Sequence, residues 1–226
     1  MCGKLECSIM KIMKTIIEKI DKNQKNTDII REAGRILKEG GLVAFPTETV
    51  YGLGADALNE DAAKKIYAAK GRPSDNPLII HITNMKALDK IVSEVPEKAV
   101  KVAEKYWPGP LTMIFNKSDI VPYGTTGGLD TVAVRMPVDE IAREVIDAGG
   151  GYIAAPSANT SGRPSPTTAQ HVAEDLTGRV DMIVDGGAVE IGVESTILDV
   201  TVEPPMILRP GAITKEMFEE VIGEVT

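Results

Sequence analysis

The sequence contains few of the residues that build disulfides, metal centres or base-stacking surfaces. Its 226 residues include two cysteines and two histidines, and aromatic residues make up 4%. Cys2 and Cys7 lie close together with no histidine nearby, so they predict neither a structural disulfide nor a zinc site. His81 and His171 are isolated and also lack the spacing of zinc ligands. We expect both cysteines to be reduced and the protein to be cytoplasmic.

Positive charge is also scarce. The 33 acidic residues outnumber the 25 basic ones, which gives a net charge of −8. This balance argues against broad, non-specific binding of nucleic acids, because such binding requires a basic face. A local basic pocket for an anionic small molecule remains compatible with it.

Long apolar runs are absent as well. None approaches the roughly 20 residues that a membrane helix needs, and the N-terminal stretch lacks the apolar core and cleavage site of a signal peptide. With 43% hydrophobic residues and a mean hydropathy of −0.03, the composition is that of a folded soluble protein. We expect residues 1–13 to be a leader or an added tail without order, and residues 14–226 to form one domain.

Hydrophobic periodicity predicts helices that alternate with short apolar strands. The expected helices cover residues 27–38, 60–69, 85–92, 96–106, 139–148, 168–176 and 214–222. The expected strands cover residues 42–45, 78–82, 111–115, 131–135, 152–155, 181–184, 195–200 and 205–209. This alternation is typical of an α/β domain with a mostly buried sheet. The last two strands are too close in sequence for a helical crossover, so the sheet is expected to be mixed.

Three common enzyme motifs are excluded. The glycines at 52 and 54, with Ala57, match the letters of a dinucleotide-binding fingerprint, but they neither follow a strand directly nor open a helix. No G-x-x-x-x-G-K-[ST] motif for a phosphate-binding loop is present. No G-x-S-x-G motif occurs either, so Ser157 and Ser195 are not expected to act as hydrolase nucleophiles.

Polar residues gather instead in a few loops at the ends of the predicted strands, where α/β proteins bind ligands. Residues 70–77 place Lys70 and Arg72 around Gly71, directly after a predicted helix. Two cations at this position either complement the helix dipole or bind phosphate, for which an arginine fork is suited. Asn76 adds a neutral donor.

Two further loops continue this pattern. Residues 156–167 combine hydroxyls, an amide and glycine directly after a predicted strand, which is typical of a neutral anion cradle or of a capped turn that leads into the next helix. Residues 192–196 and 209–211 form another cluster. Arg135 supplies another cation at the end of a predicted strand.

Seven stretches of the sequence occur in a fixed order: FPTETVYGLGADA, KGRPSDNPLIIHI, WPGPLT, TVAVRMP, APSANTSGRPSPT, GVESTILD and ILRPG. Together they resemble the YrdC-like family of threonylcarbamoyl-AMP synthases over residues 29–222. The resemblance implies a single α/β domain built on a twisted, mixed, open sheet flanked by helices, with a groove lined by basic side chains. It also implies a reaction that joins L-threonine, bicarbonate and ATP into L-threonylcarbamoyl-AMP and pyrophosphate, for the modification of tRNA next to the anticodon.

The resemblance assigns roles to individual residues. Lys70 and Arg72 match the family's basic pair and are the expected catalytic residues. The expected ATP-binding residues are Lys70, Arg72, Asn76, Thr131, Ser157, Asn159, Ser165 and Arg209. The expected threonine-binding residues are Thr49, His81, Arg135, Ala155 and Ser195, with Arg135 on the carboxylate. No side chain is expected to bind a metal, because Mg²⁺ is expected to enter with ATP and to be held by phosphate oxygens and water.

The implied partners are the small-molecule substrates, a downstream tRNA-modifying transferase complex and a weak contact with tRNA. Relatives of this form usually continue with a linker and a second domain after ILRPG, whereas this sequence ends at Thr226, so a truncated long form and a short form are both open. An RNA-binding module without catalysis is one alternative, and the net charge and the few aromatic residues weigh against it. A carbamoyl-adenylate-forming enzyme of the hydrogenase-maturation type is the other, and the accompanying modules of that type are absent from the sequence.

Overall fold

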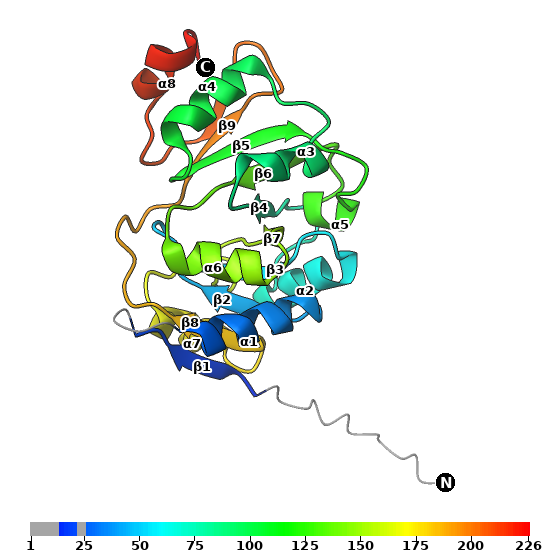
Figure 1. The fold of residues 1–226 in the computed structure, drawn as a ribbon, viewed down its shortest axis with the longest axis vertical. Helices are drawn as coiled ribbons and strands as arrows, with labels where there is room; N and C mark the ends of the chain where they lie inside the picture. The colour runs from blue at the N-terminus through cyan, green and yellow to red at the C-terminus, as the bar shows by residue number, and fades with distance from the viewer. Residues whose placement is uncertain (1–13, 22–25) are drawn as a thin grey trace.

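A sheet of mixed strand directions organises the chain in the computed structural model, which describes residues 14–21 and 26–226. The expected leader over residues 1–13, with both cysteines, lies outside the described residues. Within the described part, no helix has the length and apolar character needed to cross a membrane. Figure 1 shows the sheet running along the longest axis of the molecule, with β1 (Ile16–Lys19) near one end and β9 (Thr196–Asp199) and the C-terminal helix near the other.

The described strands, in chain order, are β1 (Ile16–Lys19), β2 (Val43–Phe45), β3 (Gly52–Asp56), β4 (Ile79–His81), β5 (Leu111–Asn116), β6 (Thr131–Arg135), β7 (Ile153–Ala154), β8 (Met182–Asp185), β9 (Thr196–Asp199) and β10 (Met206–Arg209). Their order in the sheet is β1-β8-β2-β3-β7-β4-β6-β5-β9-β10. β4 pairs with β6 in parallel and β5 pairs with β6 in antiparallel, and β9 and β10 form an antiparallel pair. The sheet is therefore mixed, as the short connection before β10 predicts.

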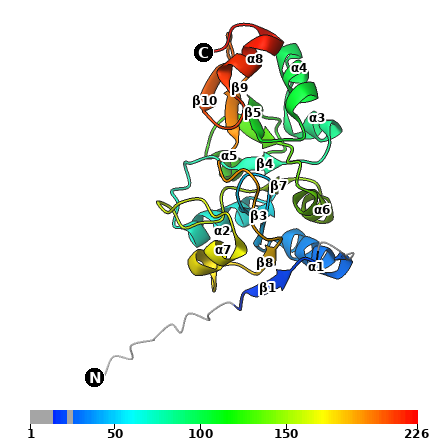
Figure 2. The same ribbon diagram turned by 90° about the vertical axis from the view of Figure 1, so that its left-hand side faces the viewer.

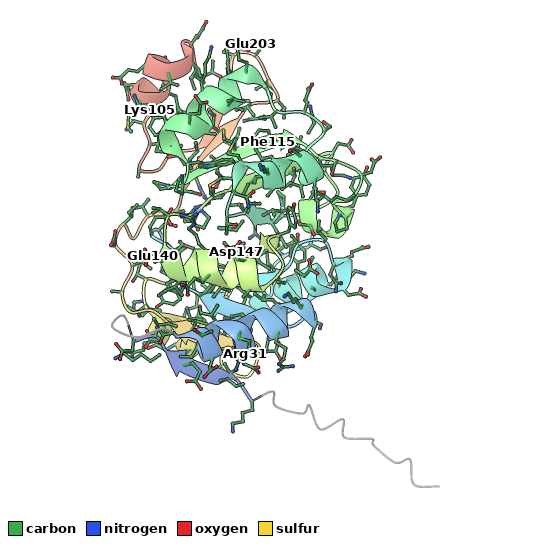
Figure 3. All side chains as sticks on the ribbon, in the orientation of Figure 1. Arg31, Lys105, Phe115, Glu140, Asp147 and Glu203 are labelled. Atoms are coloured by element: carbon green, nitrogen blue, oxygen red, sulfur yellow. The ribbon has the colours of Figure 1, made fainter. Side chains whose placement is uncertain are left out.

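Helices cover both faces of this sheet. They are α1 (Thr27–Lys38), α2 (Glu60–Lys70), the 3₁₀ turn η1 (Met85–Ala87), α3 (Leu88–Ile91), α4 (Glu97–Tyr106), α5 (Tyr123–Thr126), α6 (Glu140–Ala148), α7 (Ala169–Leu176) and α8 (Lys215–Ile222). Figure 2 shows α1, α6 and α3 along one side of the sheet and α2 and α7 along the other. Most sheet side chains are therefore buried between two layers of helices, including the fully buried Phe115 and Ile80, while charged residues such as Arg31 and Glu203 lie at the outside (Figure 3).

The predicted α/β architecture is confirmed, and the differences have local causes. β3 (Gly52–Asp56) is not among the predicted strands, because glycine is a poor strand former. A side-chain carbon added at Gly54 would lie 2.7 Å from Phe45 Cε1, so packing against β2 requires glycine inside this strand. The placement of Gly52 and Gly54 within a strand also confirms that they form no dinucleotide-binding turn.

The first helix, α1, packs closely against α6 at a glycine, and this contact provides a test of the fold. A side-chain carbon on Gly34 would lie 2.6 Å from both the Cβ and the carbonyl oxygen of Ala148. We predict that Gly34→Ala lowers the free energy of unfolding by about 1–3 kcal/mol through overpacking, although alanine is the better helix former. Urea denaturation measures the change, with Lys38→Ala at an exposed position of the same helix as the control. A Gly34→Ala variant as stable as the control variant would contradict this packing.

Candidate functional site

Three of the predicted site residues lie in one row across the sheet. Arg135 on β6 is in register with His81 on β4 and with Thr112 on β5. The row continues through Ile197 on β9 to Arg209 on β10. Residues in register on neighbouring strands project from the same face of a sheet. We call this set the polar row, because it places two arginines and a histidine on one surface.

Arg135 is buried beside a carboxylate from the same chain. Its side chain is 5% exposed, and its Nη2 atom donates a hydrogen bond of 2.7 Å to Oε1 of Glu48, whose side chain is 4% exposed. Glu48 belongs to the loop between β2 and β3, where the Thr47 hydroxyl closes a tight turn with the backbone of Val50. A hydroxyl that bonds to the backbone three residues on fixes this kind of turn. The turn therefore directs Glu48 at the polar row.

Arg209 is held in the same manner at the other end of the row. Its Nη1 atom is ion-paired with Glu194, and its Nη2 atom donates to the hydroxyl of Ser195 at 3.1 Å. The Ser195 hydroxyl also bonds to the hydroxyl of Thr112 at 2.7 Å. Glu194 in turn accepts a 2.8 Å hydrogen bond from Ser165. Arg209 is thus joined directly to Ser195 and, through Glu194, to Ser165, which are all predicted site residues.

Lys70 and Arg72 differ in the partners of their side chains, although the sequence predicts the same role for both. Helix α2 ends at Lys70, and Gly71 takes the left-handed conformation at φ 61°, which closes the helix end. The Lys70 ammonium is buried and donates to the carbonyl oxygens of Ser157 and, at 2.6 Å, of Asn159. Arg72 is half-buried and has no ion pair among the described residues. Only Arg72 of this pair therefore offers an uncommitted cation.

The loop of residues 157–163 is fixed from several sides. Besides the Lys70 ammonium, the Lys70 carbonyl accepts from the N–H of Ser161 at 2.8 Å. The side-chain amide of Asn159 donates to the carbonyls of Thr160 and Arg163. Asp175 on α7 accepts from the N–H of Thr160 at 3.0 Å. Asn159 is therefore used within the loop, while the half-buried Ser157 and Ser165 are presented at its edges.

Electrostatic effects show that these groups lie close together. Burial, and to a smaller extent the neighbouring charge of Arg72, lowers the pKa of Lys70 to about 8. Burial is also the main cause that lowers the pKa of Arg72 and of Arg209. The charge of Arg209 lowers the pKa of Arg72 further, the charge of Arg135 lowers that of Arg209, and Glu194 opposes both shifts. Burial and the charge of Arg135 lower the pKa of His81 to about 3. The site is a set of cations in a poorly hydrated environment, with a neutral histidine beside it.

Three buried side-chain atoms of the described residues have no hydrogen-bond partner, and all three belong to this site. They are Oε2 of Glu48, Nε of Arg72 and Nε of Arg135. Native proteins pair nearly all buried polar atoms, because an unpaired one costs about 1–3 kcal/mol. Two unpaired guanidinium N–H groups and one unpaired carboxylate oxygen in one place indicate a site that a charged ligand completes.

The remaining predicted site residues make no direct side-chain contact with these arginines among the hydrogen bonds of the described residues. Thr49 is buried and its hydroxyl bonds to that of Thr47 at 3.0 Å, while the N–H of Ala155 bonds to the carbonyl of Ile79. Thr131 begins β6, four residues from Arg135, which is about 13 Å along a strand. Asn76 is exposed, and its carbonyl accepts from the Tyr67 hydroxyl at 3.1 Å. The roles of Thr131 and Asn76 stay predictions.

Sequence reasoning missed four residues that shape the site, namely Glu48, Thr112, Asp175 and Glu194. Three of them stand inside quoted motifs: Glu48 and Glu194 lie directly beside Thr49 and Ser195, and Thr112 ends WPGPLT. The signal for the two glutamates was therefore present, but a carboxylate was not expected in a basic groove. In the described part of the chain, no group of three or more histidine, cysteine or acidic side chains is placed to hold a metal ion. The expected binding of Mg²⁺ through the phosphates of ATP stays a prediction.

The sequence is similar to that of known proteins of one family. A family model described as telomere recombination, which groups the Sua5, YciO and YrdC proteins, matches residues 35–211. The threonylcarbamoyl-AMP synthase of Pyrococcus abyssi is 58% identical over 196 residues, covering 87% of this chain and 58% of that protein. The threonylcarbamoyl-AMP synthase of Bacillus subtilis is 52% identical over 217 residues, covering 96% of this chain and 63% of that protein.

Comparison of the fold with solved structures finds proteins of the same family. The crystal structure of Pyrococcus abyssi Sua5 complexed with L-threonine superposes with a TM-score of 0.91 at 55% identity, covering 94% of this chain and 63% of that one. The chain spans about three fifths of the length of these relatives. The polar row therefore lies in a domain that the longer relatives share with this chain.

The different surroundings of Lys70 and Arg72 generate a test. We predict that Lys70→Met lowers the free energy of unfolding by about 2–4 kcal/mol, because it leaves the carbonyls of Ser157 and Asn159 unpaired. Arg72→Met should change it by less than about 1 kcal/mol, because the Arg72 side chain makes only a long contact with the Pro77 carbonyl. Chemical denaturation of both variants measures the difference. Equal effects on stability would contradict the fixing of the loop by Lys70.

The buried His81 predicts a specific pH dependence. Its pKa is about 3 in the folded protein and 6.5 in the unfolded chain, so between these values only the unfolded chain binds the proton and stability falls as the pH is lowered. We expect the wild-type protein to lose about 1–2 kcal/mol more than His81→Asn between pH 7 and pH 5. Urea denaturation at both pH values measures this, and an identical pH dependence of the two proteins would contradict a neutral His81.

Proposed function

The chain belongs to the Sua5/YciO/YrdC family, and on this premise we propose that it joins L-threonine, bicarbonate and ATP into L-threonylcarbamoyl-AMP with release of pyrophosphate. The observation that carries the proposal is the pair of unpaired guanidinium N–H groups of Arg72 and Arg135, two cations that both lie within electrostatic reach of Arg209. Both substrates that such groups would bind are anionic at the binding point, a carboxylate and a triphosphate. The names of the close relatives agree with this activity.

The proposed reaction needs fixed positive charge rather than a nucleophilic side chain. The amine of threonine adds to CO₂ derived from bicarbonate and forms a carbamate. A carbamate oxygen then attacks the α-phosphorus of ATP, and the bond to the β-phosphate breaks so that pyrophosphate leaves. Because charge develops on phosphate oxygens, preorganised cations and N–H donors lower the barrier. Mg²⁺ would enter with ATP and supply further neutralisation of the phosphates.

The residues divide between the two substrates in this proposal. Arg72 and Arg209 bind phosphate oxygens, and Arg135 binds the carboxylate of threonine. Ser157, Ser165, Thr131 and Asn76 contact the nucleotide, with Asn159 at the cradle, and Thr49, His81, Ala155 and Ser195 surround threonine. Glu194 holds Arg209 in the structure, so nucleotide binding would exchange this carboxylate for phosphate.

Lys70 has a revised place in the proposal. Its ammonium holds the carbonyls of Ser157 and Asn159, so it acts on the nucleotide through the loop of residues 157–163. A loop held in advance loses less entropy when the ligand binds. A direct phosphate contact by Lys70 would require the ammonium to leave these carbonyls.

The product suits a downstream transferase that modifies tRNA next to the anticodon, and we propose that this transferase complex is the partner. A weak tRNA contact by this chain is a further part of the proposal. The cytoplasm is the proposed location, because tRNA modification takes place where the substrates are made.

Pyrophosphate release tests the function. The purified chain is incubated with MgATP, with and without L-threonine and bicarbonate, and release should depend on both. Arg72→Ala should abolish release and weaken ATP binding, whereas Arg31→Ala on the exposed surface of α1 serves as the matched control. Release without dependence on threonine, or binding of tRNA without any release, would contradict the proposal.

Arg135 provides a test of substrate assignment. We predict that Arg135→Lys raises the threonine concentration for half-maximal rate at least about tenfold, because a lysine cannot reproduce the planar fork that matches a carboxylate. The corresponding ATP concentration should change by less than about threefold. Steady-state kinetics with each substrate varied in turn gives both numbers. Equal changes would place Arg135 on the nucleotide or in the scaffold.

A further inference from the structure

Glu48 is an unusual residue in this site, because it is a carboxylate in a place that otherwise selects anions. It is 4% exposed and forms a buried ion pair with Arg135 through Oε1. Its second oxygen, Oε2, is buried and has no hydrogen-bond partner. A buried carboxylate normally uses both oxygens, because removing charge from water is expensive unless it is compensated. The contact with Arg135 therefore satisfies only one of the two carboxylate oxygens of Glu48.

The geometry leaves a donor and an acceptor side by side. Glu48 occupies Nη2 of Arg135 at 2.7 Å, while Nε of Arg135 remains without a partner. The site thus offers one free guanidinium donor and one free carboxylate acceptor on two side chains that touch each other. An α-amino acid carries its carboxylate and its ammonium group on the same carbon, so its two charges need two such neighbouring partners.

The surroundings of Glu48 favour a cation on that side. Glu48 lies on the wall of a chamber of about 700 Å³, whose lining includes Asp139, Glu140, Glu144 and Glu190. Glu140 lies at the start of α6 (Figure 3). The arginines of the polar row and Arg72 are not among the lining residues of this chamber, and Arg135 contacts it through Glu48. The resulting change from negative to positive potential would orient a zwitterion as it binds.

Other acceptors near Arg135 fit an ammonium group less well. His81 is in register with Arg135 but is neutral, and its Nδ1 atom contacts the Ile79 carbonyl. The Thr49 hydroxyl is already bonded to Thr47. An ammonium group in a poorly hydrated site is bound best by a carboxylate.

We infer that Glu48 is the residue that binds the α-ammonium group of the amino-acid substrate, while Arg135 binds its carboxylate. The inference rests on the proposed function, which makes threonine the substrate. Under it, Glu48 selects amino acids against hydroxy acids and holds the nitrogen at a fixed place, where the ammonium group loses a proton to water before the free amine adds to CO₂. Glu48 is then a substrate-binding residue and Arg135 its partner, and the ion pair between them persists in the complex.

The test compares threonine with an analogue that lacks the ammonium group. (R)-3-hydroxybutyrate keeps the carboxylate, the hydroxyl and the methyl group of L-threonine. Isothermal titration calorimetry measures the affinity of both compounds for the wild-type chain, for Glu48→Gln and for Glu144→Gln. The glutamine oxygen at position 48 can still accept from Arg135, and Glu144→Gln removes the same charge from an exposed position of the chamber. ATP binding by each variant reports whether the site is folded.

We expect the wild-type chain to bind threonine at least about tenfold more tightly than the hydroxy acid. Glu48→Gln should lose this preference, with threonine weakened at least about tenfold and the hydroxy acid unchanged or improved, whereas Glu144→Gln should keep it. An equal loss for both compounds would show that Glu48 only positions Arg135, and tighter threonine binding would show that it competes with the substrate carboxylate. Either result overturns the assignment.

Two results involve the wild-type chain alone, so they do not depend on the folding of a variant. Equal affinity for threonine and the hydroxy acid would overturn the role of Glu48 and leave the proposed function in place. No detectable binding of threonine, even with ATP present, would overturn the proposed function and this assignment together.

Discussion

Buried positive charge is the constraint on which this site depends. Arg135 and Arg209 project from the sheet into a region with little water, where a guanidinium cannot lose its proton and must find anions. In the structure the chain supplies them itself, as Glu48 for Arg135 and Glu194 for Arg209. These two carboxylates do not satisfy all donors, because Nε of Arg135 and Nε of Arg72 remain unpaired. The ion pairs therefore hold the arginines in place, while the unpaired N–H groups still lack the acceptors that a ligand would supply.

The sheet turns this constraint into a geometry. Neighbouring strands are about 4.8 Å apart, so a row of residues in register sets fixed intervals between charged groups without any loop. His81, Arg135, Thr112 and Arg209 take their positions from strands that pair with one another. Lys70 and Asp175 hold the loop of residues 157–163 in place. Rigid strands carry the cations, and a fixed loop supplies the neutral donors, which is the arrangement that electrostatic preorganisation requires.

The sequence predicts the alternating elements and the family well, because hydrophobic periodicity and ordered motifs are local signals. β3 is not predicted because its residues are chosen by packing rather than by strand propensity, as Gly54 is by its contact with Phe45. The separate roles of Lys70 and Arg72 cannot be predicted from the sequence for another reason. The partners of Lys70 lie 87 and 89 residues further along the chain. The pairing of Glu48 with Arg135 likewise spans 87 residues. Such contacts depend on strand order, which no local pattern contains.

The central claim is that the unpaired N–H groups of two arginines mark where the ligands bind. Nuclear magnetic resonance of arginine Nε–H groups, assigned with Arg72→Lys and Arg135→Lys variants, observes these atoms directly. With MgATP and L-threonine both present, the Nε–H signals of Arg72 and Arg135 should move downfield as they gain acceptors, while that of the exposed Arg31 stays in place. Signals of Arg72 and Arg135 that remain unchanged at saturating concentrations of both ligands would contradict the claim.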